Sequence, residues 1–355
     1  DSPAMSIPTL TGITAKTVAS SRISTRVLFS GSDDGIPVVF IHGNASSATF
    51  WEETMLALPA GFRGIAPDLR GYGDADRTKL IDATRGMGDL ADDIAALLDA
   101  LGIAKAHIAG HSLGGAVCFR LMTDYAPRLL SVTLAATGSP YGFGGCKGVG
   151  GTPCYPDFAG SGGGTVNPAF PQAMAAGDRS DAPNSPRDIM NKFYFKPPFK
   201  PAREEELLSS LLSEHVGPQQ YPGDMTPSAN WPNVAPGVLG PINALSPKYA
   251  GDVSKIWTNP VKPPVLYVYG LDDQIVSDTS FFDLGTLGAF GVVPGWPGAD
   301  VFPSQPMVSQ TRDVLGKYEQ NGGRVTILAL PDCGHTPYIE KPAEFNAAFH
   351  ALINP

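Results

Sequence analysis

Residues 106–114, AHIAGHSLG, join a short apolar run to a serine flanked by glycines. The apolar run predicts a strand, and the small residues that follow Ser112 predict a helix. Between them lies the pattern G-x-S-x-G, in which the serine occupies a sharp turn that exposes its hydroxyl group. The glycines let the strand and helix backbones approach closely. We therefore predict that Ser112 is a nucleophile, rather than a serine that only caps a tight turn.

Short apolar runs alternate with helical patterns on both sides of this stretch. Further strands are predicted at residues 36–41, 62–66, 131–135, 264–269 and 325–330, with helices at 89–101 and 308–320 and a final one opened by Pro342. A hairpin is predicted over residues 13–29. Continuous apolar strands are typical of strands buried on both faces. The fold class is therefore predicted as α/β, a mostly parallel central sheet flanked by helices.

The alternation breaks between residues 138 and 258. This segment is rich in glycine and proline and contains one clear helical pattern, at residues 203–215. It is too long for a plain connection. We expect residues 1–137 and 259–355 to form the core, and residues 138–258 to form an inserted cap over the edge of the sheet where ligands bind.

Composition limits the partners of the chain. Its 355 residues are 43% hydrophobic and 17% charged, with a net charge of −9. An acidic surface repels phosphate backbones and anionic lipids, so neither nucleic acid nor a membrane is an expected partner. No run approaches the roughly 20 apolar residues that span a bilayer. The oligomeric state is left open.

The cysteines and the start of the chain give weaker indications. The spacing of the four cysteines fits no zinc site, and we expect neither a metal nor a cofactor. Cys146 and Cys154 are either free thiols or a disulfide, depending on the redox compartment. No signal peptide is visible, so a cytoplasmic protein is expected, with a processed secreted chain as the alternative. Met5 is one candidate for the native start.

A serine nucleophile needs a base. His335 lies in DCGHTP, residues 332–337, directly after the last predicted strand, where a loop can bring it back over the sheet. The acid that orients this histidine should follow the strand at 264–269, where Asp272 and Asp273 are adjacent. The chain order serine, acid, histidine fits an α/β sheet with a serine nucleophile.

The loop after the strand at 36–41 is the expected second half of an oxyanion hole. It reads HGNA, residues 42–45. The backbone N–H of Asn44 is one candidate donor, and the N–H of Leu113, at the start of the helix, is the other. The alternative is an ordinary turn, in which glycine and asparagine are both common.

Taken together, these motifs resemble the α/β-hydrolase superfamily. Its landmarks appear in order: HGN at 42–44 followed by Trp51, PDLRGYG at 67–73, GHSLG at 110–114, GLDDQIV at 270–276 and GH at 334–335. In that family the acid stands three residues after the glycine that ends its strand. Since that glycine is Gly270, the resemblance implies Asp273.

The loop HGNASSATFW, residues 42–51, is similar to that of haloalkane dehalogenases and epoxide hydrolases. Those enzymes use an aspartate nucleophile, whereas this chain has Ser112. The resemblance therefore implies an esterase or lactonase that forms an acyl-enzyme. Hydrolysis of a carbon–carbon bond in a diketone is an alternative with the same triad, and cofactor-free perhydrolysis is a weaker one. A non-catalytic ligand receptor on the same scaffold is the alternative of another class.

Aromatic residues of the predicted cap are candidates for contact with a small, apolar or aromatic substrate. The predicted substrate-binding residues are Phe143, Tyr155, Phe195 and Trp231, with Phe158, Phe193 and Tyr194 in the same segment. Aromatic residues in such a segment can instead form a small core of its own.

Overall fold

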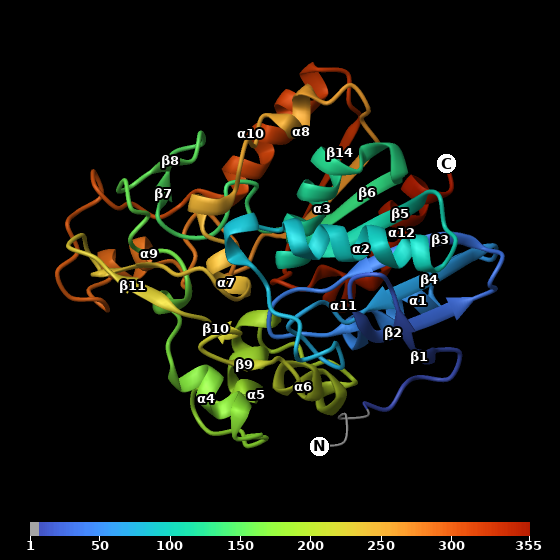
Figure 1. Ribbon diagram of the computed structural model, residues 1–355, viewed down its shortest axis with the longest axis horizontal. Helices are drawn as coiled ribbons and strands as arrows, with labels where there is room; N and C mark the ends of the chain where they lie inside the picture. Colours follow the sequence, from blue (N-terminus) through green and yellow to red (C-terminus); the bar gives the residue numbers. More distant parts are fainter. Residues whose placement is uncertain (1–6) are drawn as a thin grey trace.

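The computed structural model describes residues 7–355, so the candidate start at Met5 lies outside them. Within these residues the centre is an eight-stranded sheet in the order β1-β2-β4-β3-β5-β6-β13-β14 (Figure 1). The strands are β1 (Thr14–Ala19), β2 (Ser24–Gly31), β3 (Ile36–Ile41), β4 (Phe62–Pro67), β5 (Ala106–His111), β6 (Leu129–Ala135), β13 (Val265–Gly270) and β14 (Val325–Leu330). The pairs β1–β2 and β2–β4 are antiparallel, and every other pair in this sheet is parallel. The predicted α/β fold is confirmed.

Both faces of the central strands are buried. On β3, Val39 and Ile41 pack into one apolar cluster, while Val38 and Phe40 pack into another. Successive side chains of a strand point to opposite faces, so the continuous apolar run fills both layers. The edge strand β14 differs, since Ile327 is 38% exposed.

Helices cover the two faces of the sheet. The first layer contains α2 (Gly88–Ala100), α3 (Leu113–Asp124), α8 (Lys255–Thr258) and α10 (Met307–Gln320); the second contains α1 (Glu52–Leu56), α11 (Pro337–Glu340) and α12 (Pro342–Ile353). Short 3-10 turns lie at Ala48–Trp51, Ala83–Arg85 and Ala126–Arg128. Among residues 7–355, no helix has the length and apolar character needed to traverse a bilayer.

The segment after β6 lies beside the sheet, in the green and yellow parts of Figure 1. Its helices are α4 (Ala169–Ala175), α5 (Pro186–Ile189), η5 (Met190–Tyr194), α6 (Glu204–Leu212) and α7 (Pro241–Ala244), with 3-10 turns at Gly163–Thr165 and Pro247–Tyr249. Its strands are β7 (Cys146–Lys147), β8 (Thr152–Pro153), β9 (Val216–Gly217), β10 (Tyr221–Pro222), β11 (Met225–Pro227) and β12 (Val234–Pro236). Through Leu207, Leu208 and Leu211, α6 joins the second apolar cluster.

Two local differences from the sequence expectations are visible. The helix predicted at 203–215 ends at Leu212, so His215 lies beyond it. The stretch 281–306 contains a short helix, α9 (Leu284–Ala289), that its glycine content obscures. Asp283 begins this helix by accepting a hydrogen bond from the N–H of Gly285, which is the usual role of an aspartate at that position.

Candidate active site

Ser112 occupies the single residue between β5 and α3. Its backbone has φ 56° and ψ −116°, in the positive-φ region that non-glycine residues rarely adopt. Such strain persists only where the surrounding structure holds it in place, and it is typical of functional turns. His111 and Leu113 on either side are buried, whereas Ser112 keeps partial exposure. The turn therefore presents the hydroxyl group toward solvent from an otherwise buried segment.

Gly114 shows why this turn needs small residues. A Cβ atom at this position would overlap the carbonyl oxygen of Ile41 and approach that of His42 at 2.7 Å. Helix α3 thus begins in direct backbone contact with the end of β3. Only glycine permits that approach, because a backbone carbonyl cannot rotate away as a side chain can.

His335 and Asp273 lie side by side after the two last strands of the sheet. His335 Nδ1 donates to Asp273 Oδ2 at 2.7 Å, and both side chains are almost fully buried. The other carboxylate oxygen, Asp273 Oδ1, accepts from the N–H groups of Ile275 at 2.8 Å and Val276 at 3.0 Å. With Nδ1 carrying the proton, the unprotonated nitrogen of His335 is Nε2, the atom that a general base requires.

His111 connects the serine turn to the histidine loop. Its Nε2–H donates to the carbonyl oxygen of His335 at 2.7 Å, and the hydroxyl group of Tyr338 donates to its Nδ1 at 2.9 Å. Burial lowers the pKa of His111 well below its usual value, so the ring is neutral, as these two hydrogen bonds require. Within residues 7–355, Ser112 makes no hydrogen bond to His335, so their direct contact stays a prediction.

The loop after β3 passes directly against Ser112. A Cβ atom on Gly43 would lie 3.1 Å from the Cβ atom of Ser112. Among the described residues, the backbone N–H groups of Asn44 and Leu113 donate to no other group. Two free N–H groups beside a candidate nucleophile can bind an oxyanion.

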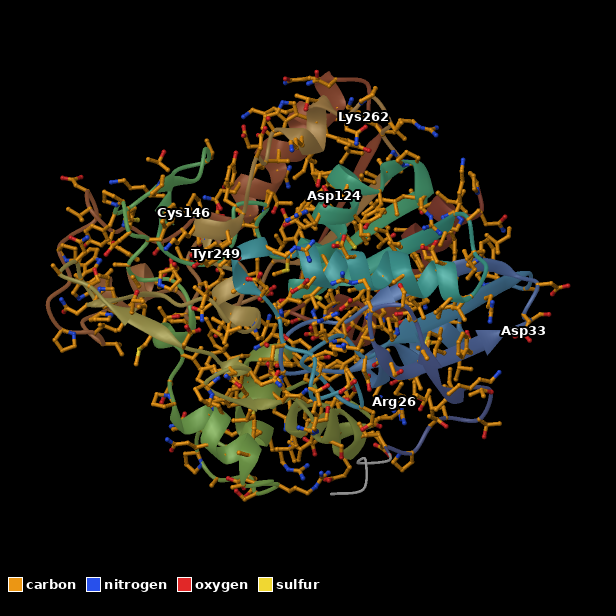
Figure 2. All side chains as sticks on the ribbon, viewed as in Figure 1. Arg26, Asp33, Asp124, Cys146, Tyr249 and Lys262 are labelled. Atoms are coloured by element: carbon orange, nitrogen blue, oxygen red, sulfur yellow. The ribbon has the colours of Figure 1, made fainter. Side chains whose placement is uncertain are left out.

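A buried ion pair between Arg26 and Asp68 supports the loop after β3. Arg26 on β2, labelled in Figure 2, donates from Nε to Asp68 Oδ2 at 3.0 Å. Asp68 Oδ1 in turn accepts from the N–H of Ala48 at 3.0 Å. His42 accepts from the N–H of Leu69 at 3.0 Å, and burial lowers the pKa of its imidazole to about 4. The motif that includes Asp68 therefore anchors the loop and does not itself face Ser112.

Some site contacts come from residues that sequence reasoning did not assign. Tyr194 donates from its hydroxyl group to the carbonyl oxygens of Ala45 at 2.8 Å and Asn44 at 3.2 Å. Glu340 accepts from the N–H groups of Gly334 at 2.9 Å and Thr336 at 3.0 Å, one on each side of His335. The Tyr194 contact leaves no sequence signal, because it joins a side chain to backbone groups about 150 residues away, whereas Glu340 contacts backbone groups only six and four residues before it.

The four predicted substrate-binding residues lie in two different places. Tyr155 and Trp231 pack against Phe302, with ring centroids 6.1 and 5.0 Å away. Phe195 is buried against Phe199, and Phe143 packs at the edge of the second apolar cluster. These contacts join the segment to itself and to the core, so substrate contact by these residues stays a prediction.

The structure also shows the surroundings of Asp272 and of the two cysteines that the sequence analysis left open. Asp272 is exposed and pairs with Lys196 at 3.2 Å. Cys146, labelled in Figure 2, and Cys154 are free thiols at the β7–β8 hairpin. Burial raises the pKa of each thiol to about 12. Among residues 7–355, no set of three or more His, Cys, Asp or Glu side chains could hold a metal ion.

Comparison with known proteins places this geometry in a family. A family model described as alpha/beta hydrolase fold matches residues 36–151, which include β3, the loop after it and the serine turn. The protein has the α/β-hydrolase fold. The predicted resemblance is thereby confirmed.

Curated relatives match part of the chain. A dihydrolipoyllysine-residue acetyltransferase component of an acetoin cleaving system from Pseudomonas putida is 39% identical over 30% of this chain and 28% of its own. An AB hydrolase superfamily protein from Bacillus subtilis is 33% identical over 35% of this chain and 44% of its own. The chain thus spans less than half the length of these curated relatives.

A solved structure matches over almost the whole length. The 2-hydroxy-6-oxo-6-phenylhexa-2,4-dienoate hydrolase from a Rhodococcus species gives a TM-score of 0.58 at 18% identity, covering 97% of this chain and 99% of its own. The two proteins therefore share the fold over almost their whole length.

Proposed function

We propose that the protein is a serine hydrolase that cleaves a carboxylic ester or lactone through an acyl-enzyme on Ser112. The observation that carries the proposal is the 2.7 Å hydrogen bond from His335 Nδ1 to Asp273. This hydrogen bond leaves Nε2 of His335 as the ring nitrogen that faces away from Asp273. The loop that carries His335 also contacts His111, the residue before Ser112. The chain order serine, acid, histidine agrees with it.

In the proposed mechanism, Ser112 Oγ attacks the substrate carbonyl carbon while its proton passes to His335 Nε2. The negative oxygen is bound by the N–H groups of Asn44 and Leu113, and Asp273 stabilises the imidazolium ion that forms. His335 then gives the proton to the departing alkoxide, which leaves as an alcohol or as the opened end of a lactone. A water molecule, activated by His335, attacks the acyl-enzyme and releases the acid.

The segment 138–258 has the role of a cap in this proposal. Its contacts support that role, because the Tyr194 hydroxyl group reaches the Asn44–Ala45 backbone and the N–H of Lys196 donates to Glu340 at 2.8 Å. The segment is thus joined to the loop of the oxyanion donors and, through Glu340, to the loop of the base. A small apolar or aromatic substrate suits its aromatic content.

The test compares the wild type with Ser112→Ala on p-nitrophenyl esters, lactones and diketones. Ser112→Ala should reduce ester and lactone turnover to near background, whereas Ser180→Ala, at an exposed serine, should change nothing. Wild-type protein should also be labelled at Ser112 by an organophosphonate.

Each other outcome has a distinct meaning. Turnover confined to diketones would establish the carbon–carbon alternative with the same nucleophile. Ester turnover retained by Ser112→Ala would refute the nucleophile. Absence of both labelling and turnover in the wild type would favour a ligand receptor on this scaffold.

A further inference from the structure

Glu214 is a buried carboxyl group beside the loop of the oxyanion donors. It follows α6 in the inserted segment and is 3% exposed. Its Oε1 accepts from the N–H of Ala45 at 2.9 Å, the residue directly after Asn44. A buried carboxyl group is costly unless it is paired or protonated, so its presence here needs an explanation.

The side chain of Asn44 lies between Glu214 and Tyr72. The Tyr72 hydroxyl group donates to Asn44 Oδ1 at 2.7 Å, and the same end of the amide lies 2.8 Å from Glu214 Oε2. An oxygen atom cannot lie that close to a carboxylate oxygen unless a proton joins them. Either the amide is turned, so that its nitrogen donates to both neighbours, or Glu214 is a neutral acid that donates to Oδ1.

Burial favours the neutral acid. It raises the pKa of Glu214 well above its usual value, and the hydrogen bond from the N–H of Ala45 opposes this shift. The titratable groups that face Glu214 are Tyr72, Tyr194 and Tyr221, whose own pKa values burial also raises. The adjacent His215 points elsewhere and hydrogen-bonds to the carbonyl oxygen of Gly73 at 2.9 Å.

We propose that Glu214 is a positioning residue that fixes the oxyanion-hole loop from the inserted segment, through hydrogen bonds to the Ala45 N–H and the Asn44 amide. The inference rests on the proposed function, because it concerns the N–H of Asn44 as an oxyanion donor. Glu214 contacts no reacting atom in this role. It holds the backbone N–H of Ala45 and the side-chain amide of Asn44, so that the Asn44 N–H between them keeps its direction.

The role has a consequence for pH. When Glu214 loses its proton, its carboxylate repels Asn44 Oδ1, and the amide must turn to present its nitrogen. The tyrosines around it stay neutral over the same range, so Glu214 is the group that changes. The turned amide no longer accepts from the Tyr72 hydroxyl group, so the Asn44 side chain loses that support. We therefore expect turnover to fall at alkaline pH in the wild type, and this loss to be absent when residue 214 cannot ionise.

The experiment uses Glu214→Gln, Glu214→Ala and the control Glu206→Gln, which removes a carboxylate from α6 in the same segment. Turnover of p-nitrophenyl butyrate is measured from pH 5 to 9.5, together with labelling of Ser112 by an organophosphonate. Glutamine can accept from Ala45 and donate to Asn44, as the neutral acid does. We expect Glu214→Gln and Glu206→Gln to keep kcat within about threefold, and only the Glu214→Gln protein to lose the alkaline decline. Since one misdirected oxyanion donor is worth up to about 10²–10³ in kcat, Glu214→Ala should lose about 10- to 100-fold with little change in KM.

Two results would overturn the positioning role. One is a kcat for Glu214→Ala within threefold of the wild type, and the other is an alkaline decline that persists in Glu214→Gln. If Glu214→Ala does not fold, the pH profile of Glu214→Gln decides alone. A wild type that neither turns over the ester nor is labelled contradicts the proposed function itself, and the positioning role with it. Normal wild-type turnover with unaffected Glu214 variants removes only the positioning role.

Discussion

The Nε2–H of His111 donates to the carbonyl oxygen of His335 at 2.7 Å, so the residue before the candidate nucleophile holds the loop of the candidate base. The two rings are also in contact, with centroids 4.8 Å apart. The turn that exposes Ser112 and the loop that carries His335 are therefore built as one unit, although more than 200 residues separate them in the chain.

Replacing His111 by phenylalanine should disturb both stability and turnover. It leaves the buried His335 carbonyl group and the Tyr338 hydroxyl group without partners, and each unpaired group costs about 1–3 kcal/mol. The loop then shifts, and kcat should fall on the order of 10- to 100-fold. Urea unfolding and steady-state kinetics measure the two effects. His350→Phe, in α12, is the control and should leave kcat unchanged; equal losses in both variants would contradict the link.

The adjacent aspartates offer a matched pair of variants. Asp273→Asn keeps the shape of the side chain but no longer accepts the His335 Nδ1 proton as a carboxylate does, so kcat should fall on the order of 10⁴-fold. Asp272→Asn removes only an exposed ion pair with Lys196, which solvent screens, so kcat should stay close to the wild-type value. Steady-state kinetics on the same ester distinguish them. A larger loss for Asp272→Asn would reverse the assignment of the acid.

Two glycines in helices should respond in opposite ways to alanine. Gly114→Ala forces α3 away from the end of β3, which should destabilise the protein by about 1–3 kcal/mol and lower turnover. Gly316→Ala, in α10, meets no atom within 4 Å and should stabilise it by about 0.5–1 kcal/mol. Thermal unfolding measures both. Equal stability of the two variants would show that the close approach of α3 and β3 is unimportant.

Acid should destabilise the protein through its buried histidines. Burial lowers the pKa of His107 to about 4. Between pH 6.5 and 4, the unfolded chain therefore binds a proton at His107 that the folded protein does not bind. The contribution of neutral His107 to the free energy of unfolding is complete above pH 6.5 and is lost as the pH falls toward 4. The loss is about 2 kcal/mol after allowance for solvent screening. In His107→Gln this contribution should be absent, so its unfolding free energy should change less over that range. Parallel curves for the two proteins would show that His107 does not contribute.

The core of this fold could be predicted because its signals are local. The run at 36–41 and the serine turn at 110–114 each depend on a few adjacent residues, and the structure has β3 at Ile36–Ile41. Asp273 needed the family pattern, because two neighbouring aspartates cannot be separated by composition. Geometry adds what that pattern could not, since only Asp273 is buried and bonded to His335.

The contacts of residues 138–258 could not be predicted from the sequence. From the sequence, Glu214 is a polar residue near the end of the helix predicted at 203–215, and its burial becomes visible only when α6 packs beside the loop at 44–45. Tyr194 reads as one aromatic residue in a run of several, although its hydroxyl group reaches Ala45. Both roles depend on backbone groups about 150 or more residues away, which no spacing pattern records.

The N–H of Lys196 donates to the same Glu340 carboxylate that receives the N–H groups flanking His335. Residues 138–258 are thus joined to the loop of His335 through Lys196 and to the loop of Asn44 through Tyr194. Exchanging this segment for that of a relative, to alter substrate range, would remove both fastenings at once. Both donors lie within residues 194–196, so a working chimera must keep this short stretch, or supply matching donors, and can exchange the chain on either side of it.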